Sequence, residues 1–187
     1  MSTTARFSLD QYELMIEAGA FDGEHRQRVE FIRGEIRQMT PISPRHACAV
    51  DWLNAWSFEN TSRGDVIVRI QSTARIPELE SAPEPDVLWL VNKDYRAQHP
   101  EPGDILLLIE VAESSLAYDT GEKAQLYAEA PIQDYWVVNL VDDCVEVFRQ
   151  PQPAGYQSRR VARGDDEIRP LAFAELVFKP SALLKRS

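Results

Sequence analysis

The spacing of apolar and polar positions alternates along the chain between a helical and a strand period. Val50, Leu53 and Trp56 recur at helical spacing, which predicts a helix from about Pro44 to Gly64. Short apolar runs without that spacing predict strands at residues 66–70, 86–91 and 104–112. The last of these runs is the most apolar, so its strand should be central and covered on both faces.

Turn and capping signals place the other elements. Short apolar runs on both sides of residues 33–34 and of residues 142–143 predict two β-hairpins. Two capping boxes predict the starts of further helices, near residues 9 and 120: Ser8 with Gln11 and Asp119 with Glu122. This order of elements favours an α/β fold with a mixed β-sheet core flanked by helices.

Composition and length suit a globular protein. The chain has 187 residues, of which 44% are hydrophobic and 27% charged, and we expect a single domain over residues 1–187. No apolar run approaches the roughly 18 residues that span a bilayer. Residues 1–6 lack the apolar stretch of a secretion signal. We therefore expect a cytoplasmic protein that does not use a membrane.

The net charge of −10 argues against a simple protein that coats nucleic-acid phosphates, because such proteins are normally basic. It does not exclude a nuclease, since active-site carboxylates add negative charge and a bound cation reverses the local sign. Cys48 and Cys144 lie in no CxxC or Cys/His cluster, so the sequence carries no zinc-site signal, and we expect two buried free thiols.

Two carboxylates occupy chemically suggestive positions. Asp86 opens a predicted strand directly after Pro85, and Glu110 directly follows the apolar run of residues 105–109 in the next strand. A carboxylate beside a dry core has a raised pKa unless a cation or hydrogen bonds compensate its charge. If the two strands are neighbours, both side chains converge on one hard cation such as Mg²⁺. The alternative for Asp86 is an ordinary carboxylate at the end of a strand.

Lys123 is the third candidate. It lies early in the helix that follows the Glu110 strand, and a short connection brings its ammonium group back over the carboxylates. There it would orient a metal-bound water and balance charge, as hydrolysis of a phosphodiester requires. Taken alone, a lysine on a helix is more often solvated. The order and spacing of all three residues favour a catalytic role for Lys123 over a solvated one.

These residues resemble the PD-(D/E)xK signature of restriction-endonuclease-like nucleases. Pro85-Asp86 and Glu110-Val111-Ala112 provide its acidic positions, whereas Ala112 stands where the signature has lysine. Related families move this lysine to the following helix, which Lys123 matches. A longer set of blocks, over roughly residues 8–180, resembles the Uma-two family of restriction endonucleases: residues 29–39, 44–46, 84–87, 109–123 and 127–138.

The resemblance implies a restriction-endonuclease-like core with Mg²⁺ or Mn²⁺ as cofactor. Asp86, Glu110 and the backbone carbonyl of Val111 would be metal ligands, and Lys123 the catalytic lysine. Glu30 would support the metal or its water as a further catalytic residue. Two more polar residues match recurrent positions of the family, His46 and Gln71.

Two hypotheses of different class follow. The first is a metal-dependent endonuclease that hydrolyses phosphodiester bonds in DNA. The second is a catalytically silent binding or regulatory module that keeps the nuclease fold. A homodimer would suit an enzyme that cuts both strands, and the apolar hairpin near Trp136 and Val145 is the surface that would form it.

Overall fold

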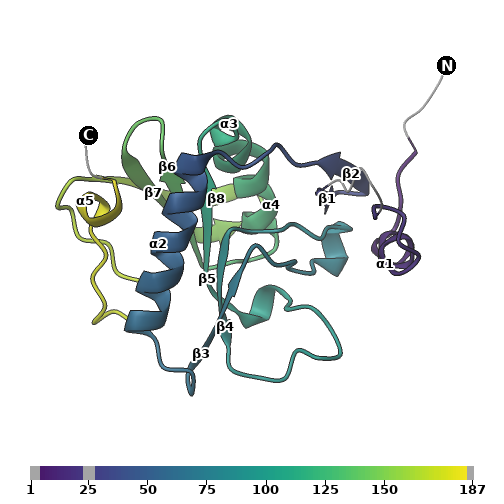
Figure 1. Cartoon of the computed structure of the whole chain (residues 1–187), viewed down its shortest axis with the longest axis horizontal. Coiled ribbons are helices and arrows are strands. Elements are labelled where there is room, and N and C mark those ends of the chain that lie inside the picture. Colours follow the sequence, from purple (N-terminus) through teal and green to yellow (C-terminus); the bar gives the residue numbers. More distant parts are fainter. Residues whose placement is uncertain (1–4, 23–27, 185–187) are drawn as a thin grey trace.

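The computed structural model describes residues 5–22 and 28–184, and its centre is a six-stranded mixed sheet with helices on both faces (Figure 1). The strand order is β3-β4-β5-β6-β7-β8, and all neighbours are antiparallel except β5 and β6. The strands are β3 (Val66–Ile70), β4 (Val87–Val91), β5 (Ile105–Ala112), β6 (Asp134–Asn139), β7 (Cys144–Gln152) and β8 (Gly155–Arg163). The predicted fold class is confirmed.

Strand β5 is central, as its apolar run predicts, and its side chains alternate between two cores. Leu107 and Ile109 pack in the core beneath helix α2 (Pro44–Asn60), whereas Leu108 packs in the core beneath helix α4 (Ala124–Glu129). Because successive side chains of a strand point to opposite faces, Glu110 lies on the α4 side. The period of the strand therefore directs this carboxylate toward the helix that carries Lys123.

Helix α2 covers the other face of the sheet and begins at a capped N-terminus. The hydroxyl group of Ser43 accepts a hydrogen bond from the backbone N–H of His46. Further along α2, the ring of Trp56 stacks on Trp89 with 5.2 Å between their centroids. Both rings are buried, so these tryptophans pack the core rather than offer faces for stacking of bases.

The segment between β5 and β6 differs from its prediction. A continuous helical stretch begins at Leu116 rather than near Thr120, and it consists of α3 (Leu116–Tyr118), a π-helical turn η3 (Asp119–Lys123) and α4. Asp119 is not an N-cap: it lies inside this stretch and is 3% exposed. A π-turn shifts the side chains that follow it by one position, and such turns are frequent at functional sites.

The N-terminal part forms a separate small layer at one side of the sheet. It contains α1 (Leu9–Glu17) and a hairpin of β1 (Val29–Ile32) and β2 (Glu35–Gln38). Backbone hydrogen bonds between Phe31 and Ala82 tie this hairpin to the loop before β4. In Figure 1 the hairpin and α1 lie at the right of the view, on the opposite side of the molecule from α5 (Pro180–Leu183). Two short 3-10 turns complete the structure: η1 (Pro77–Leu79) and η2 (Pro102–Asp104).

The structure corrects two expectations about exposed and buried residues, and a third falls partly outside the residues that it describes. Trp136 and Val145 are fully buried in the core, so they cannot form a dimer surface. Cys144 is buried as expected, but Cys48 is exposed because it occupies an outward position of α2; both thiols are free. Residues 1–4 of the N-terminal segment lie outside the described residues.

Among the residues that the structure describes, no helix is both long and apolar enough to cross a membrane.

Candidate active site

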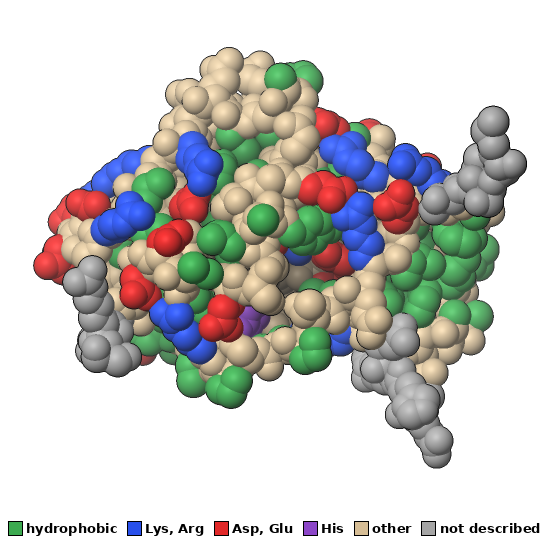
Figure 2. All heavy atoms as spheres, turned by 90° about the horizontal axis from the view of Figure 1, so that it is seen from above, with side chains coloured by type: hydrophobic (Ala, Val, Ile, Leu, Met, Phe, Trp, Pro, Cys, Tyr) green, Lys and Arg blue, Asp and Glu red, His purple; other side chains and the backbone are tan. Residues whose placement is uncertain are grey.

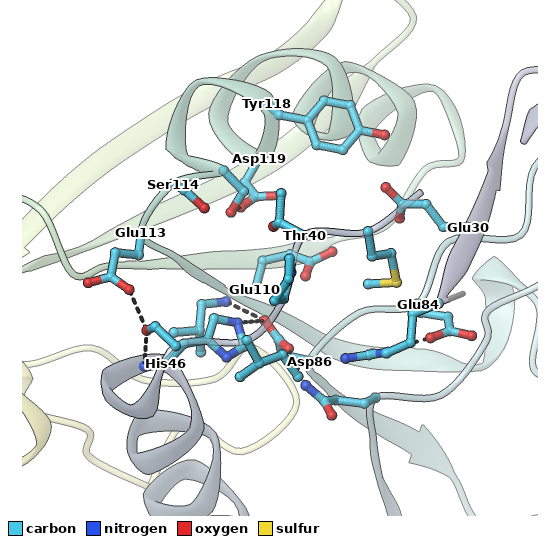
Figure 3. Close-up of a pocket in the computed structure, with 18 of the residues that line it drawn as sticks. Glu30, Thr40, His46, Glu84, Asp86, Glu110, Glu113, Ser114, Tyr118 and Asp119 are labelled. Atoms are coloured by element: carbon cyan, nitrogen blue, oxygen red, sulfur yellow. Dashed lines mark hydrogen bonds and ion pairs between the residues drawn. The ribbon is translucent and has the colours of Figure 1, made fainter. Parts of the chain in front are cut away.

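A cavity of about 320 Å³ opens where β4 and β5 meet the N-terminus of α2, the hairpin and the π-turn. Most of the residues labelled in Figure 3 are polar, and they come from all of these elements. Seen from above in Figure 2, the molecule is hollowed near its middle, where acidic and basic side chains meet. The cavity contains every side chain that the sequence singled out as catalytic or metal-binding: Glu30, Asp86, Glu110 and Lys123.

Asp86 is fixed by three donors. Its Oδ2 accepts a hydrogen bond from the backbone N–H of Val111 (2.8 Å) and lies 3.1 Å from Nε2 of His46. Its Oδ1 accepts a hydrogen bond from the Gln71 amide (3.1 Å). Burial of Asp86 opposes ionisation, but His46, Val111 and Gln71 together hold the pKa of the carboxyl below its usual value. Asp86 is therefore a buried, ionised and rigidly oriented carboxylate.

The position of Asp86 follows from strand register. Val87 pairs with Ile109 across the antiparallel strands β4 and β5, which places Asp86 beside Glu110 and Val111 at the same end of the sheet. Gln71 reaches Asp86 because it follows β3 in a left-handed conformation, with φ +46°. His46 reaches it from the first turn of α2. The hydrogen bond from His46 raises the pKa of the imidazole, although burial opposes this.

Glu110 is the most deeply placed carboxylate. Its Oε1 accepts hydrogen bonds from Nζ of Lys123 (2.9 Å) and from the hydroxyl group of Tyr127 (2.8 Å). Burial raises the pKa of Glu110 to about 8, and the nearby charges of Asp119 and Asp86 act in the same direction, whereas Lys123 opposes the rise. Glu110 thus holds a proton more readily than an exposed glutamate.

Lys123 is the buried cation at the centre of these acids. Besides Glu110, its Nζ lies 3.1 Å from Oε2 of Glu30 and 3.9 Å from Oδ1 of Asp119. Burial lowers the pKa of a lysine, but these three carboxylates outweigh burial and raise the pKa of Lys123 above its usual value. The ammonium group therefore remains charged, and it does not point to bulk solvent. Its Nζ also lies 5.6 Å from the centre of the Tyr118 ring.

The cavity carries more acid than base. Burial raises the pKa of Asp119 to about 6, and the charges of Asp86 and Glu30 act in the same direction, whereas Lys123 and Ser115 oppose the rise. Six carboxylates line the cavity, against two permanent cations, Lys123 and Arg28, and His46. Oxygen donors in excess negative charge fit a hard divalent cation. Within residues 5–22 and 28–184, no three or more His, Cys, Asp or Glu side chains are grouped so that they could hold a metal ion. Water and substrate oxygens would have to complete the shell of a cation bound here. Mg²⁺ is typically bound in this way.

The structure brings together Asp86, Glu110, Lys123 and Glu30, and it places His46 and Gln71 on Asp86. Val111 contributes its amide to Asp86, while the role of its carbonyl as a metal ligand stays a prediction. Sequence reasoning missed two further members of the cluster, Asp119 and Tyr127. Their spacing of four residues on either side of Lys123 was the available signal, because residues four apart share one helix face.

Comparison with known proteins identifies the family and a similar fold. A family model described as "Uma2: Putative restriction endonuclease" matches residues 9–181. Among solved structures, a crystal structure titled as a putative nuclease belonging to DUF820 from Anabaena variabilis is similar, with a TM-score of 0.74. The two chains are 15% identical, and the match covers 95% of this chain and 97% of the other, which shows a shared fold. No match was found among curated protein sequences. Because the family model spans most of the chain, the protein belongs to the Uma2 family.

Proposed function

We propose that this protein is a metal-dependent endonuclease that hydrolyses phosphodiester bonds in DNA. The observation that carries the proposal is the position of Lys123. Its ammonium group, supplied by the helical segment after β5, lies within 2.9 Å of Glu110 and within 3.1 Å of Glu30, in the cavity that also holds Asp86. Membership of a family whose model is described as "Putative restriction endonuclease" supports the same proposal.

Asp86, Glu110 and the backbone carbonyl of Val111 would hold Mg²⁺ or Mn²⁺. When bound, the cation would supply Lewis-acid stabilisation of the negative charge that develops on the phosphate. Asp86 is prepared for this role because His46 and Gln71 orient its carboxylate, one contact on each oxygen. The raised pKa of Glu110 means that a cation must displace a proton from this carboxyl group.

Lys123 and Glu30 would act on the attacking water. The ammonium group donates hydrogen bonds, so it can orient a water oxygen toward phosphorus and stabilise the developing negative charge. Oε2 of Glu30 is buried and accepts no hydrogen bond within the described residues, although it lies near Nζ of Lys123. In Figure 3 the Glu30 carboxylate projects into the pocket. It is therefore placed to accept a hydrogen bond or a proton from the water.

The net charge of −10 is compatible with this function because six of the carboxylates line the cavity itself. A bound divalent cation together with Lys123 offsets the cavity charge at the point where a phosphate must enter. Binding of the substrate phosphate then depends on the bound cation as well as on basic side chains at the surface. We expect DNA binding to weaken when divalent metal is removed, since the cavity then repels phosphate.

The test is a cleavage assay with matched variants. The purified chain is incubated with supercoiled plasmid, linear duplex, single-stranded DNA and RNA, in Mg²⁺, Mn²⁺ or EDTA. Asp86→Asn and Lys123→Met remove the two central groups with little change of volume. Asp51→Asn and Lys179→Met make the same chemical changes at exposed positions and serve as controls. Calorimetry measures metal binding by wild type and Asp86→Asn.

We expect metal-dependent cleavage by the wild type and both controls, with a loss of at least about a hundredfold in each site variant. Metal binding should weaken in Asp86→Asn. A wild-type protein that is as inert as its site variants on all four substrates, and whose metal binding does not depend on Asp86, would refute the proposal. That result would favour a catalytically silent module with the nuclease fold.

A further inference from the structure

A second, larger cavity of about 1330 Å³ adjoins the candidate active site. Arg28, Gln71 and Glu84 line both cavities, so the two are immediate neighbours. In Figure 3 Glu84 lies on the side of Asp86 opposite Glu113, which marks the direction in which the larger cavity extends. The second cavity therefore lies where a chain-like substrate with one bond at Asp86 would continue.

Four arginines line the second cavity, and they differ in their partners. Within residues 5–22 and 28–184, Arg69 forms no ion pair with a carboxylate. Its guanidinium group lies 5.0 Å from the centre of the Tyr95 ring, a cation–π contact that orients the group without neutralising it. The other three are paired with carboxylates: Arg28 with Glu84 (3.3 Å), Arg75 with Glu13 (2.7 Å) and Arg96 with Asp94 (2.6 Å).

Strand register places Arg69 close to the candidate catalytic residues. Arg69 is the β3 partner of Leu88, whose side chain packs in the α4-side core, so Arg69 shares the sheet face of Glu110. Gln71, which hydrogen-bonds to Asp86, follows two residues later. Two residues of extended chain span about 7 Å. The backbone of Arg69 therefore lies about 7 Å from that of Gln71, the residue that contacts the candidate metal ligand Asp86.

We propose that the second cavity holds the nucleic-acid strand beside the cleaved bond and that Arg69 binds a phosphate of that strand. This inference rests on the proposed nuclease function. An arginine fork matches the oxygens of a phosphate, and Arg69 can bind one without breaking an ion pair. The paired arginines would have to release a carboxylate first. Arg69 is therefore a substrate-binding residue outside the catalytic group.

The test compares arginine variants by affinity and by its salt dependence. Binding of a labelled single-stranded oligonucleotide is measured in EDTA over a series of NaCl concentrations, for wild type, Arg69→Gln and Arg69→Lys. Arg96→Gln is the matched control, because it lines the same cavity but is paired with Asp94. Cleavage in Mg²⁺ or Mn²⁺ is measured in parallel for wild type and Asp86→Asn. Thermal unfolding verifies that each variant is folded.

We expect Arg69→Gln to weaken binding about tenfold or more and to reduce the steepness of the log K against log [salt] plot by about 0.7, the value for one phosphate contact on a single strand. Arg69→Lys should keep the wild-type slope, and Arg96→Gln should keep both slope and affinity. Equal slopes for Arg69→Gln and wild type, or a slope lost equally in Arg69→Lys, overturn the inference.

The two proposals fail in different ways. If wild type cleaves in an Asp86-dependent manner while Arg69→Gln binds normally, only the binding site is refuted. If wild type neither binds the oligonucleotide nor cleaves any substrate, the nuclease proposal fails and the inference fails with it.

Discussion

Nζ of Lys123 lies 2.9 Å from Oε1 of Glu110, and each of these side chains is only 5% exposed. The pair joins the central strand β5 to the helical segment that follows it. In a buried pair each charge depends on its partner, because the loss of one partner leaves an uncompensated charge in a medium that solvates it poorly. Lys123 is therefore a structural counter-charge as well as the candidate catalytic cation.

Lys123→Met should destabilise the protein, and more so at alkaline pH. Around pH 9 the variant leaves Glu110, Glu30 and Asp119 buried without their cation, and we expect a loss of about 3–5 kcal/mol in the free energy of unfolding. Around pH 6 the loss should be smaller, because Glu110 has a pKa already raised to about 8 and becomes neutral. Urea unfolding at both pH values measures the difference.

Lys179→Met, at an exposed position, is the control for that measurement and should be nearly neutral. The double variant Lys123→Met/Glu110→Gln should recover part of the lost stability at pH 9, because it removes one of the unpaired charges. A loss that is equal at pH 6 and pH 9, with no recovery in the double variant, would show that Lys123 does not compensate these carboxylates.

The stability of the metal-free wild-type protein should fall as pH rises from about 4.5 to about 8. Glu110 keeps its proton in the folded state up to a pKa of about 8, whereas the unfolded chain releases it near the usual value of 4.5. The folded state then binds more protons than the unfolded state, so stability decreases with pH, at most about 1.4 kcal/mol per pH unit for this group. Above pH 8 the contribution of Glu110 is constant.

Urea unfolding in EDTA across this range, on wild type and Glu110→Gln, tests the assignment to Glu110. The variant should lose most of the decline between pH 6 and 8 and be more stable than wild type at pH 8. It should keep the smaller part of the decline that comes from His46, whose pKa is also raised in the folded state. It should keep a weaker decline below pH 6, because the pKa of Asp119 is raised to about 6 from 3.8. The same decline in both proteins between pH 6 and 8 would assign it to another group.

Tyr127→Phe should weaken the site without changing the fold. The variant removes the hydroxyl group that donates a hydrogen bond to Oε1 of Glu110 at 2.8 Å. Loss of a donor to a buried carboxylate costs about 1–3 kcal/mol and disfavours the ionised form. We therefore expect a higher pKa for Glu110 and weaker binding of Mg²⁺ or Mn²⁺ in calorimetry at neutral pH.

Tyr156→Phe is a matched control for this effect. Its hydroxyl group also donates a 2.8 Å hydrogen bond, but to the backbone carbonyl of Ile132, away from the carboxylates. This variant should lose stability to a similar degree while its metal binding is unchanged. Equal metal affinity in the two variants would mean that Tyr127 supports packing alone.

Much of the fold and part of the site follow from local patterns. The apolar run before Glu110 identifies the central strand, and Pro85 marks the approach to β4, which begins at Val87, one residue after the predicted start at Asp86. Both signals depend only on residues that are neighbours in the sequence, so tertiary packing does not change the elements that they predict. The departure at Ala112 directs attention to Lys123, and the structure places that lysine on Glu110. Strand period and motif position were sufficient for these three residues.

Other members of the cluster depend on contacts that no local pattern encodes. Glu30 lies beside Lys123 because a hairpin far away in the sequence packs against the π-turn. Asp119 resembles an N-cap in sequence, since Glu122 follows it at capping-box spacing, but the helical stretch starts earlier and buries it. The choice between these outcomes is made by tertiary packing, which overrides a capping preference of about 1 kcal/mol.

Gln71→Gly should separate backbone strain from function. Gln71 has φ +46°, a conformation that costs a residue with a Cβ about 1–3 kcal/mol, and its amide donates a hydrogen bond to Asp86. Glycine relieves the strain but adds entropy to the unfolded chain and removes the hydrogen bond. These effects oppose each other, so stability should change by less than about 1 kcal/mol. Metal binding and cleavage should decrease, because Asp86 loses one of its orienting donors.

Gln150→Gly is the control for the backbone effect. Gln150 has φ +58° on an exposed part of β7 and does not line the cavity. It should keep wild-type cleavage at equal or higher stability. Equal cleavage by both variants would show that the left-handed backbone at Gln71 serves the turn alone and that Asp86 does not need this donor.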